Sequence, residues 1–401
     1  MKSEFITKPL SEIADIQTGP FGSQLHKKDY VQVGTPIVTV EHLGKKAFTK
    51  RNLPCVSNDD KERLSKYILQ EGDIVFSRVG SVDRCSYVSH DYDGWLFSGR
   101  CLRVRPLMEI DPQYLYYFFT LESTKQFVRG IATGATMPSI NTKFMGEIPI
   151  VYPKIDVQRK IASIFNLIDD KIELNRNINE NLEQQAQALF KSWFLDYEPW
   201  DGCMPNSWNS GKLGDFAEIK RGGSPRPIQE YLSDSGLRWL KISDVTSLQT
   251  PFIIDIKDHI IEAGLRKTVF LKAGSLVLSN SATPGVPKIL DVDSCIHDGW
   301  LYFPESKFSK EYLYLYFKYI RQQLVNLSNG SVFNNLKTDI LKGYPTILPD
   351  KKTLRRFDDI VMPMFLQIRN LTRESHKLAD MRDVLLLKLM SGEFDVSNVE
   401  I

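Results

Sequence analysis

Two similar halves follow one another in this 401-residue sequence, and this internal duplication limits its possible folds more than any other feature. Leu10–Ile16 matches Leu213–Ile219 at an offset of 203 residues, with apolar and acidic residues in the same order. Leu69–Ser77 matches Leu271–Ser279 at an offset of 202 residues. Because both matches keep their order along the chain, the two halves are predicted to share one fold.

The correspondence continues toward the end of each half. Asp93–Leu96, with the sequence Asp-Gly-Trp-Leu, recurs as Asp298–Leu301, and the aromatic run Tyr114–Phe119 recurs as Tyr312–Phe317. From Gly134 onward the offset stays at 196 residues without a gap. We therefore expect the elements of the first half to have counterparts in the second.

The first part of each half is predicted to form a globule of mixed α and β structure. β-rich runs such as Thr35–Val40 and Gly72–Ser77 lie between turn signals of Gly and Pro. A helical stretch near Pro112–Glu122 interrupts the strands, and its counterpart lies near Lys310–Arg321. The predicted boundaries are a globular domain at 1–152, a helix at 153–195, a linker at 196–207, a second globular domain at 208–350 and a helix at 351–394.

The second part of each half predicts one long helix with coiled-coil periodicity. Mostly apolar residues recur in alternating steps of four and three, which is the spacing of a heptad seam. Polar residues interrupt the seam at Asn175, Asn179, Ser375 and Arg382. The residues predicted to form the helix-pairing seam are Ile161, Phe165, Ile168, Ile172, Leu182, Leu189, Phe357, Val361, Met364, Ile368, Leu378 and Leu385.

Two arrangements of these helices are open. Each stripe could bury its helix against its own globular domain, or the two helices could pair. We favour an antiparallel pair, because a helix of this kind would run about 60 Å, longer than a compact domain needs. The predicted fold class is α+β, with two similar globular domains separated by two long antiparallel helices in a coiled coil, under a pseudo-two-fold axis. Asn175, Asn179 and Ser375 would fix the register in the middle of the pair; a plain solvent-facing break is the alternative.

Composition excludes few classes of protein, but it narrows the chemistry. The formal net charge is +2, so any phosphate-binding surface must come from local segregation of charge. Five cysteines lie far apart without a Cys-x-x-Cys pair, so neither a zinc site nor a disulfide framework is expected. The first residues lack the apolar core of a signal peptide and no later stretch reaches the length of a membrane span. We expect a cytoplasmic protein without a membrane partner.

Known catalytic motifs are missing from the sequence. We find no phosphate-binding loop, dinucleotide-binding glycine motif, zinc-protease motif, nucleophile elbow or Asn-Pro-Pro-Tyr motif of amino-methyltransferases. Six histidines show no metal-ligand spacing, and His297 beside Asp298 is interpreted as a loop residue. We therefore predict no catalytic residue and no metal site. Duplication of a whole globule-plus-helix unit fits recognition of a two-part ligand better than it fits catalysis.

Basic and amide side chains in the globular parts suggest DNA as that ligand. Lysine and arginine would bind phosphates, while arginine, asparagine and glutamine can read base edges in the major groove. Paired lysines can equally be ordinary solubility residues. The candidate DNA-binding residues are Lys27, Lys28, Lys45, Lys46, Arg78, Arg84, Asn141, Lys143, Lys220, Arg221, Arg226, Asn280, Lys288, Asn334, Asn335 and Lys337.

One loop in each half is the preferred base reader. In the first half it is Ser77–Arg84, and in the second it is Ser279–Gly285, where Asn280 occupies the position of Arg78. A strand end that keeps its framework while exchanging Arg for Asn is expected of two domains that read different bases.

The chain resembles the specificity subunits of type I restriction-modification systems over essentially its full length. The resemblance lies in Pro9–Gly19, in the strand Glu71–Ser77, in the entry to the first helix at Pro149 and Pro153, and in Leu189–Pro199. Met204–Trp208, with the sequence Met-Pro-Asn-Ser-Trp, adds to it. The order of these motifs, together with the duplication, is more specific than any one of them.

The resemblance implies two target recognition domains, each reading one half of a bipartite site in double-stranded DNA. It also implies that the long helices act as a spacer and dock two modification subunits, which would carry S-adenosylmethionine and methylate adenine. A restriction subunit would supply ATP- and Mg²⁺-dependent translocation and cleavage, and this chain would bind no cofactor itself. The alternatives are a methyltransferase or nuclease with unrecognised motifs, which S-adenosylmethionine binding by the isolated chain would favour, and a DNA-binding scaffold outside restriction.

Overall fold

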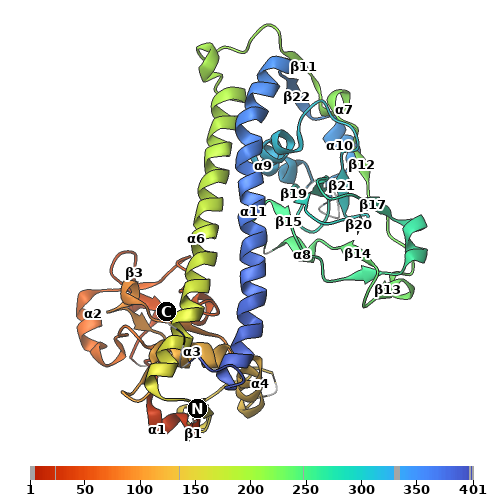
Figure 1. Cartoon of the computed structure of the whole chain (residues 1–401). Coiled ribbons are helices and arrows are strands. Elements are labelled where there is room, and N and C mark those ends of the chain that lie inside the picture. The colour runs from red at the N-terminus through yellow and green to blue at the C-terminus, as the bar shows by residue number, and fades with distance from the viewer. Residues whose placement is uncertain are drawn as a thin grey trace. The chain divides into compact units, whose positions relative to one another are not determined.

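The chain forms two compact units in the computed structural model, which describes residues 5–22, 24–134, 136–246, 248–328, 335–396 and 399, apart from the side chains of Lys27 and Ser328. Unit 1 comprises Met1–Asp170 and Ala379–Ile401, and unit 2 comprises Lys171–Leu378. Each unit therefore combines one globular part with segments of two long helices, α6 (Ile155–Phe194) and α11 (Lys351–Met390). Figure 1 shows the elements along the chain.

Unit 1 contains two four-stranded sheets and a closing pair of strands. The first sheet is antiparallel and has the order β2 (Ala14–Thr18), β9 (Cys101–Pro106), β6 (Ile74–Ser77) and β7 (Cys85–Tyr87). The second has the order β3 (Tyr30–Val31), β5 (Cys55–Val56), β4 (Thr35–Val38) and β8 (Leu96–Phe97), and its β4–β8 pair is parallel. β1 (Ile6–Pro9) pairs with β10 (Pro149–Tyr152). The short helices are α1 (Leu10–Ile13), α2 (Asn58–Arg63), α3 (Pro112–Thr120), α4 (Glu122–Ile131) and α5 (Thr142–Gly146).

Unit 2 repeats this plan with five strands in each sheet. One sheet has the order β12 (Lys220–Arg221), β21 (Trp300–Tyr302), β18 (Leu276–Ser279), β19 (Pro287–Leu290) and β15 (Phe252–Ile253). The other has the order β13 (Leu232–Ser233), β16 (His259–Ile260), β14 (Leu237–Leu240), β20 (Ser294–Ile296) and β17 (Val269–Leu271). β11 (Asn209–Lys212) pairs with β22 (Pro345–Leu348). The helices are α7 (Leu213–Phe216), α8 (Ser243–Thr246), α9 (Lys310–Ser328) and α10 (Thr338–Lys342).

Strand pairing identifies the equivalent positions of the two globular parts. Ser77 pairs with Cys101 in unit 1, and Ser279 pairs with Trp300 in unit 2. The parallel pair β4–β8 corresponds to the parallel pair β14–β20. Cys101 is therefore the structural counterpart of Trp300.

The Asp-Gly-Trp-Leu match is consequently wrong as a structural alignment. Leu96 lies in β8, which pairs in parallel with β4, whereas Leu301 lies in β21, which pairs with β18 and β12. The two tetrapeptides therefore lead into different strands of the common plan. A four-residue identity can arise by chance, whereas a pairing register is fixed by the backbone hydrogen bonds of the whole sheet.

Aromatic residues of α3 and α9 fill the two cores and reach the long helices. In unit 1 the ring of Tyr117 lies 5.0 Å from that of Phe165 on α6, measured between centroids. In unit 2 Phe357 on α11 is fully buried, and its ring centroid lies 6.0 Å from Tyr312 and 4.9 Å from Phe194. Each globular part is thus continuous with the helix segments of its own unit.

Within unit 2, α6 and α11 lie side by side and antiparallel (Figure 1). Asn175 is fully buried; its amide donates to Glu374 Oε2 at 2.9 Å and to Ser375 Oγ at 3.3 Å. Four residues further along α6, Asn179 Nδ2 donates to Thr372 Oγ1 at 3.2 Å. The residue numbers rise on α6 while they fall on α11, so the predicted antiparallel pairing is confirmed. The polar seam residues face the partner helix, which supports their predicted role in the register.

Within unit 1 the remaining helix segments also pair. Arg382 Nη1 lies 2.9 Å from Asp169 Oδ1, and Leu386, Leu389 and Met390 are buried in the same core as Phe165. The polar residue at seam position 382 is therefore an ion-pair partner of α6.

The predicted seam residues are all buried or half-buried, but the buried faces of the helices are wider than the seam. Ala186, Phe190 and Phe194 on α6 are also buried, and Phe365 on α11 contacts Tyr314 of α9 with ring centroids 5.4 Å apart. Each helix packs on its partner helix and on a globular part, so the two arrangements considered from the sequence occur together.

Two carboxylates on α6, half-buried Asp169 and buried Glu183, are held by tyrosine hydroxyls. In unit 1, Tyr117 donates to Asp169 Oδ2 at 2.8 Å. In unit 2, Glu183 is 8% exposed, accepts from the Tyr314 hydroxyl at 2.8 Å and forms an ion pair with Lys318. A charge out of water needs such partners, so these contacts fix α6 against α3 and α9.

Removing the Phe357 ring should destabilise unit 2 strongly. Phe357→Ala is expected to lower the free energy of unfolding by about 3–5 kcal/mol, because the ring is fully buried among other rings and leaves a cavity. Ile360→Ala is the matched control on the same helix: its side chain is 41% exposed, so we expect a loss of at most about 0.5–1 kcal/mol. Urea denaturation of the full chain measures both, and equal losses would contradict the assigned core.

Candidate nucleic-acid interface

Four loops of unit 1 meet at the end of the β2-β9-β6-β7 sheet. We call residues 19–22, 78–84, 98–100 and 136–141 the first loop cluster. Its backbone bonds run from Gly19 N to Cys101 O at 3.2 Å, from Arg78 N to Arg100 O at 2.8 Å and from Ile140 N to Arg78 O at 3.0 Å. The loops are therefore held together by main chain, whatever side chains they carry.

The equivalent loops of unit 2 are joined by the same bonds. We call residues 222–227, 280–285, 297–299 and 335–337 the second loop cluster. Gly222 N donates to Trp300 O at 2.9 Å, Asn280 N to Gly299 O at 2.9 Å, and Leu336 N to Asn280 O at 2.7 Å. A Cβ on Gly222 would lie 2.2 Å from the carbonyl oxygen of His297, so glycine is required where the two loops cross.

Arg78 and Asn280 occupy equivalent positions in these clusters. Besides the matching backbone bonds, Arg78 Nη1 donates to Gly99 O at 3.3 Å and Asn280 Nδ2 donates to Asp298 O at 3.1 Å. Both side chains thus bridge to the same carbonyl of the common frame. Arg78 is half-buried, whereas Asn280 is only 3% exposed. Asn280 therefore supports its loop in the free protein, and base reading by either residue stays a prediction.

The side chains around these two positions differ in kind. In the first cluster Phe21 is 54% exposed and its ring centroid lies 5.5 Å from the Arg78 guanidinium carbon. In the second, Ser224 stands at the equivalent position and donates from Oγ to Asp298 Oδ1 at 2.7 Å. Sequence reasoning missed Phe21 and Asp298. Phe21 could have been predicted as a surface residue of the site, because an aromatic side chain in a Gly-Pro-Phe-Gly turn is expected to be exposed.

Acidic residues partner the basic residues in the second loop cluster and in the adjoining strand β12 (Lys220–Arg221). Lys220 Nζ lies 2.8 Å from Glu218 Oε1. Arg221 Nε donates to the carbonyl oxygen of Asp298 at 2.5 Å, and Arg226 Nη2 lies 3.3 Å from Asp298 Oδ2. Burial raises the pKa of the Asp298 carboxyl, but the Ser224 hydroxyl and the Arg221 guanidinium outweigh it and hold that pKa below its usual range.

The lysine pairs of unit 1 have different surroundings. Lys28 and Lys45 are exposed, and the Lys27 side chain lies outside the described residues. Lys46 is half-buried; its Nζ donates to Asn166 Oδ1 at 2.6 Å and to the Tyr117 hydroxyl at 3.1 Å. Burial lowers the Lys46 pKa, although Asp169 and Asp170 oppose this. Lys46 thus anchors its loop to α6.

Arg84 and Asn141 also make contacts within unit 1. The Arg84 guanidinium donates to Leu43 O. Asn141 caps α5, and its Oδ1 accepts from Phe144 N at 2.9 Å. Both side chains are exposed, as is Lys143 in the first turn of α5. These contacts stabilise local structure and leave the predicted DNA contacts untested.

Lys288 does not lie on the surface of unit 2. Its side chain is buried, and Nζ donates to Leu248 O at 2.7 Å and to Thr250 O at 2.5 Å. Lys288 therefore fixes a loop, and the prediction that it contacts DNA at the surface is wrong. Strand β19, which carries it, runs through the core, and sequence spacing alone does not reveal this. Of the last predicted loop, Asn334 lies outside the described residues, Asn335 is half-buried and Lys337 is exposed at the start of α10.

A family model described as "Type I restriction modification DNA specificity domain" matches residues 2–184 and again residues 205–363. The chain belongs to this family. Its two copies of the domain contain the first and second loop clusters, respectively. The chain is thus a type I specificity subunit with two target recognition domains, and its role lies in recognition of DNA targets within a restriction-modification complex.

Relatives of this specificity subunit extend over most of its length. It is 25% identical to the type I restriction enzyme MjaIX specificity subunit of Methanocaldococcus jannaschii, covering 72% of this chain and 70% of the relative. It is 24% identical to the HindI specificity subunit of Haemophilus influenzae, covering 82% and 88%. The crystal structure of the type I S subunit from M. genitalium has a TM-score of 0.62 at 14% identity and covers 97% of this chain and 96% of that one, which supports the fold.

The described part of this specificity subunit shows no cluster of side chains suited to a metal ion. Among the described residues, no three His, Cys, Asp or Glu side chains are grouped so that they could hold a metal ion. His297 Nδ1 accepts from Gly299 N at 2.7 Å, and burial lowers the His297 pKa, so this ring is a neutral support of its loop. No helix in the described ranges is long and apolar enough to cross a membrane.

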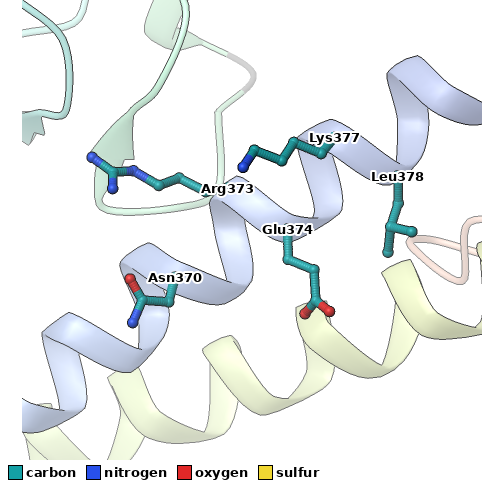
Figure 2. Close-up of a pocket in the computed structure, with 5 residues that line it drawn as sticks. All are labelled: Asn370, Arg373, Glu374, Lys377 and Leu378. Atoms are coloured by element: carbon teal, nitrogen blue, oxygen red, sulfur yellow. The ribbon is translucent and has the colours of Figure 1, made fainter.

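A hollow on α11 is lined by Asn370, Arg373, Glu374, Lys377 and Leu378 (Figure 2). Arg373 points toward the globular part of unit 2, where its Nη2 lies 2.8 Å from Asp291 Oδ1, and Glu374 points toward α6 and accepts from Asn175. Arg373 and Glu374 therefore hold α11 against the globular part of unit 2 and against α6. We interpret the hollow as a gap left where α11 packs on these neighbours.

Lys288 should give unit 2 a characteristic pH dependence. Burial lowers the pKa of Lys288 to about 8, from an ordinary value of 10.5. Between these values the unfolded chain binds the proton and the folded chain does not, so stability rises with pH. We expect the free energy of unfolding of the wild type to gain up to about 3 kcal/mol relative to Lys288→Met between pH 8 and pH 10. Denaturation of both proteins at several pH values measures this, and parallel pH profiles would contradict it.

Proposed function

We propose that this specificity subunit reads a bipartite site in double-stranded DNA, with one half-site per target recognition domain, and that it has no catalytic activity of its own. The two loop clusters carry this proposal. Arg78 and Asn280 make the same bonds to one backbone frame, yet the side chains around them differ in kind, with exposed Phe21 in the first cluster and Ser224 at that position in the second. A frame kept constant with changed side chains is the arrangement expected of two readers with different targets.

Phosphate contacts would come from the exposed basic residues of each globular part. Lys28, Lys45 and Lys143 are exposed in unit 1, and Arg226 is 80% exposed in unit 2. Such residues can supply salt-dependent affinity, which compensates for a net charge of only +2. We propose them as positioning contacts, and the clusters as the source of sequence preference.

Docking of two modification subunits is proposed for the long helices. In unit 1, Met381, Val384 and Leu387 on α11 recur at intervals of three and are 48%, 57% and 58% exposed. In unit 2, Leu174 on α6 is 52% exposed. Apolar side chains this exposed on otherwise polar helices support a protein partner. S-adenosylmethionine, ATP and Mg²⁺ are proposed to bind in the modification and restriction subunits, while this chain binds none of them.

Exchange of one recognition domain should change one half-site only. Residues 1–152 are replaced by those of a relative with a different target, and the methylated sequence is determined by genome-wide methylation sequencing. We expect a new first half-site beside an unchanged second one, because each cluster is built within one unit. The reciprocal exchange of 208–350 is the matched control. If both half-sites changed in either chimera, the two-reader proposal would fail.

Lengthening both helices should change the spacer between the half-sites. Duplicating Ile172–Ile178 and Leu371–Lys377 adds one heptad to each partner of the pair, in phase with the Asn175 contacts. Seven helical residues add about 10 Å, roughly the rise of three base pairs. We expect a longer spacer with unchanged half-sites in the methylated sequence. The control duplicates α6 alone, which should abolish assembly; an unaltered spacer in the double variant would exclude a ruler role.

A further inference from the structure

Asp298 is the most connected side chain of the second loop cluster. It lies between β20 and β21, and its Oδ1 accepts from Ser224 Oγ at 2.7 Å. Its Oδ2 faces two guanidiniums, 3.3 Å from Arg226 Nη2 and 3.9 Å from Arg221 Nη2. Its carbonyl oxygen accepts from Arg221 Nε and from Asn280 Nδ2. One residue thus connects the basic loop, the end of β12 and the end of β18.

The fold does not require this arrangement. The register of β9 and β21 makes Gly99 the counterpart of Asp298, and Thr18 the counterpart of Arg221. Unit 1 therefore keeps the same backbone frame without a carboxylate or an arginine at these two positions. The Arg221–Asp298 contact is an addition specific to the second recognition domain.

Stability does not explain the contact either. The side chains of Arg221 and Asp298 are 52% and 38% exposed, and ion pairs this exposed contribute little to folding. What the contact does provide is orientation. Arg221 Nε donates to the Asp298 carbonyl oxygen, and Arg221 Nη2 lies 3.9 Å from the Asp298 carboxylate oxygen Oδ2. Together these two contacts limit the rotamers of the long Arg221 side chain, while about half of that side chain stays accessible.

We propose that Asp298 is a positioning residue that fixes Arg221 for bidentate contact with a guanine in the second half-site. Guanine offers two acceptors, O6 and N7, that match the donor fork of arginine, and a held fork loses less conformational freedom on binding. Arg226, with 80% of its side chain exposed and one nitrogen near the same carboxylate, is assigned a phosphate contact. This inference rests on the proposed function.

Asp298→Asn tests the proposal against a closely matched control. Asp293 lies at the other end of β20, is 39% exposed, and pairs with Lys272 at 2.8 Å, so Asp293→Asn removes a similar charge pair away from the loop cluster. Each full-length variant is assembled with the modification subunits of its system. Binding is then measured on duplexes that keep the first half-site and carry each base pair in turn at every position of the second.

We expect Asp298→Asn to lower the preference for guanine over other bases at one position of the second half-site by about tenfold, whereas Asp293→Asn leaves it unchanged. Preference within the first half-site should stay the same in both variants, and Asp298→Glu should restore part of the lost preference. Arg221→Lys should weaken the same preference, because lysine lacks the planar donor fork and the Nε–H group that donates to the Asp298 carbonyl.

Three outcomes would overturn the inference. Asp298→Asn could bind all sequences more tightly with unchanged preference, which would make Asp298 a mere counter-charge. Both aspartate variants could behave alike, or both half-sites could weaken together, which would indicate lost stability of the chain. If the wild-type complex itself selected no bipartite sequence, the proposed function would fail, and this result is distinct from the other three.

Discussion

Enclosed carboxylates on α6 are the constraint on which much of this structure depends. Asp169 is held by the Tyr117 hydroxyl and by Arg382, and Glu183 by the Tyr314 hydroxyl and Lys318. A carboxylate away from water is stable only with such partners in place, and removing one partner leaves a costly unpaired group. These contacts therefore determine how α3, α9 and α11 can be oriented around α6 within each unit. Apolar packing alone would tolerate a slide along the helix more easily.

The aromatic cores and the loop clusters have different tasks, and the fold separates them. Phe165 and Phe357 lie in cores where ring packing is dense and a change of one side chain is costly. The loop clusters are instead joined by backbone bonds, such as those of Gly19 and Gly222 with the strand opposite. Because main-chain bonds do not depend on side-chain identity, the residues on these loops can vary without loss of the frame. This separation allows one fold to carry two recognition surfaces.

The sequence predicted those features that depend on periodicity. The heptad seam that includes Ile161 and Ile368 could be predicted, because apolar residues recur at alternating steps of four and three over many helical turns. The polar seam residue Asn175 faces the partner helix, as predicted. Burial of Lys288 was not readable, because it depends on which strand lies beside β19. The Asp-Gly-Trp-Leu match failed for a related reason: local identity carries no information about pairing partners. The importance of Asp298 also depends on residues far away in the chain, namely Ser224 and Asn280, that only the fold brings to it.

The composition of unit 1 has a consequence for biosynthesis. Its core includes Leu386, Leu389, Met390 and Val396, and a Cβ on Gly392 would lie 2.6 Å from the ring of Phe5, so the segment after α11 packs against the residue that precedes β1. During translation, the globular part of unit 1 emerges from the ribosome long before these residues of α11 and Val396 are synthesised. The globular part of unit 1 must therefore keep an open apolar surface, or fold provisionally, until α11 and Val396 have been synthesised. A chain cut short by even a few turns of α11 would expose that surface permanently and present itself to the quality-control machinery of the cell.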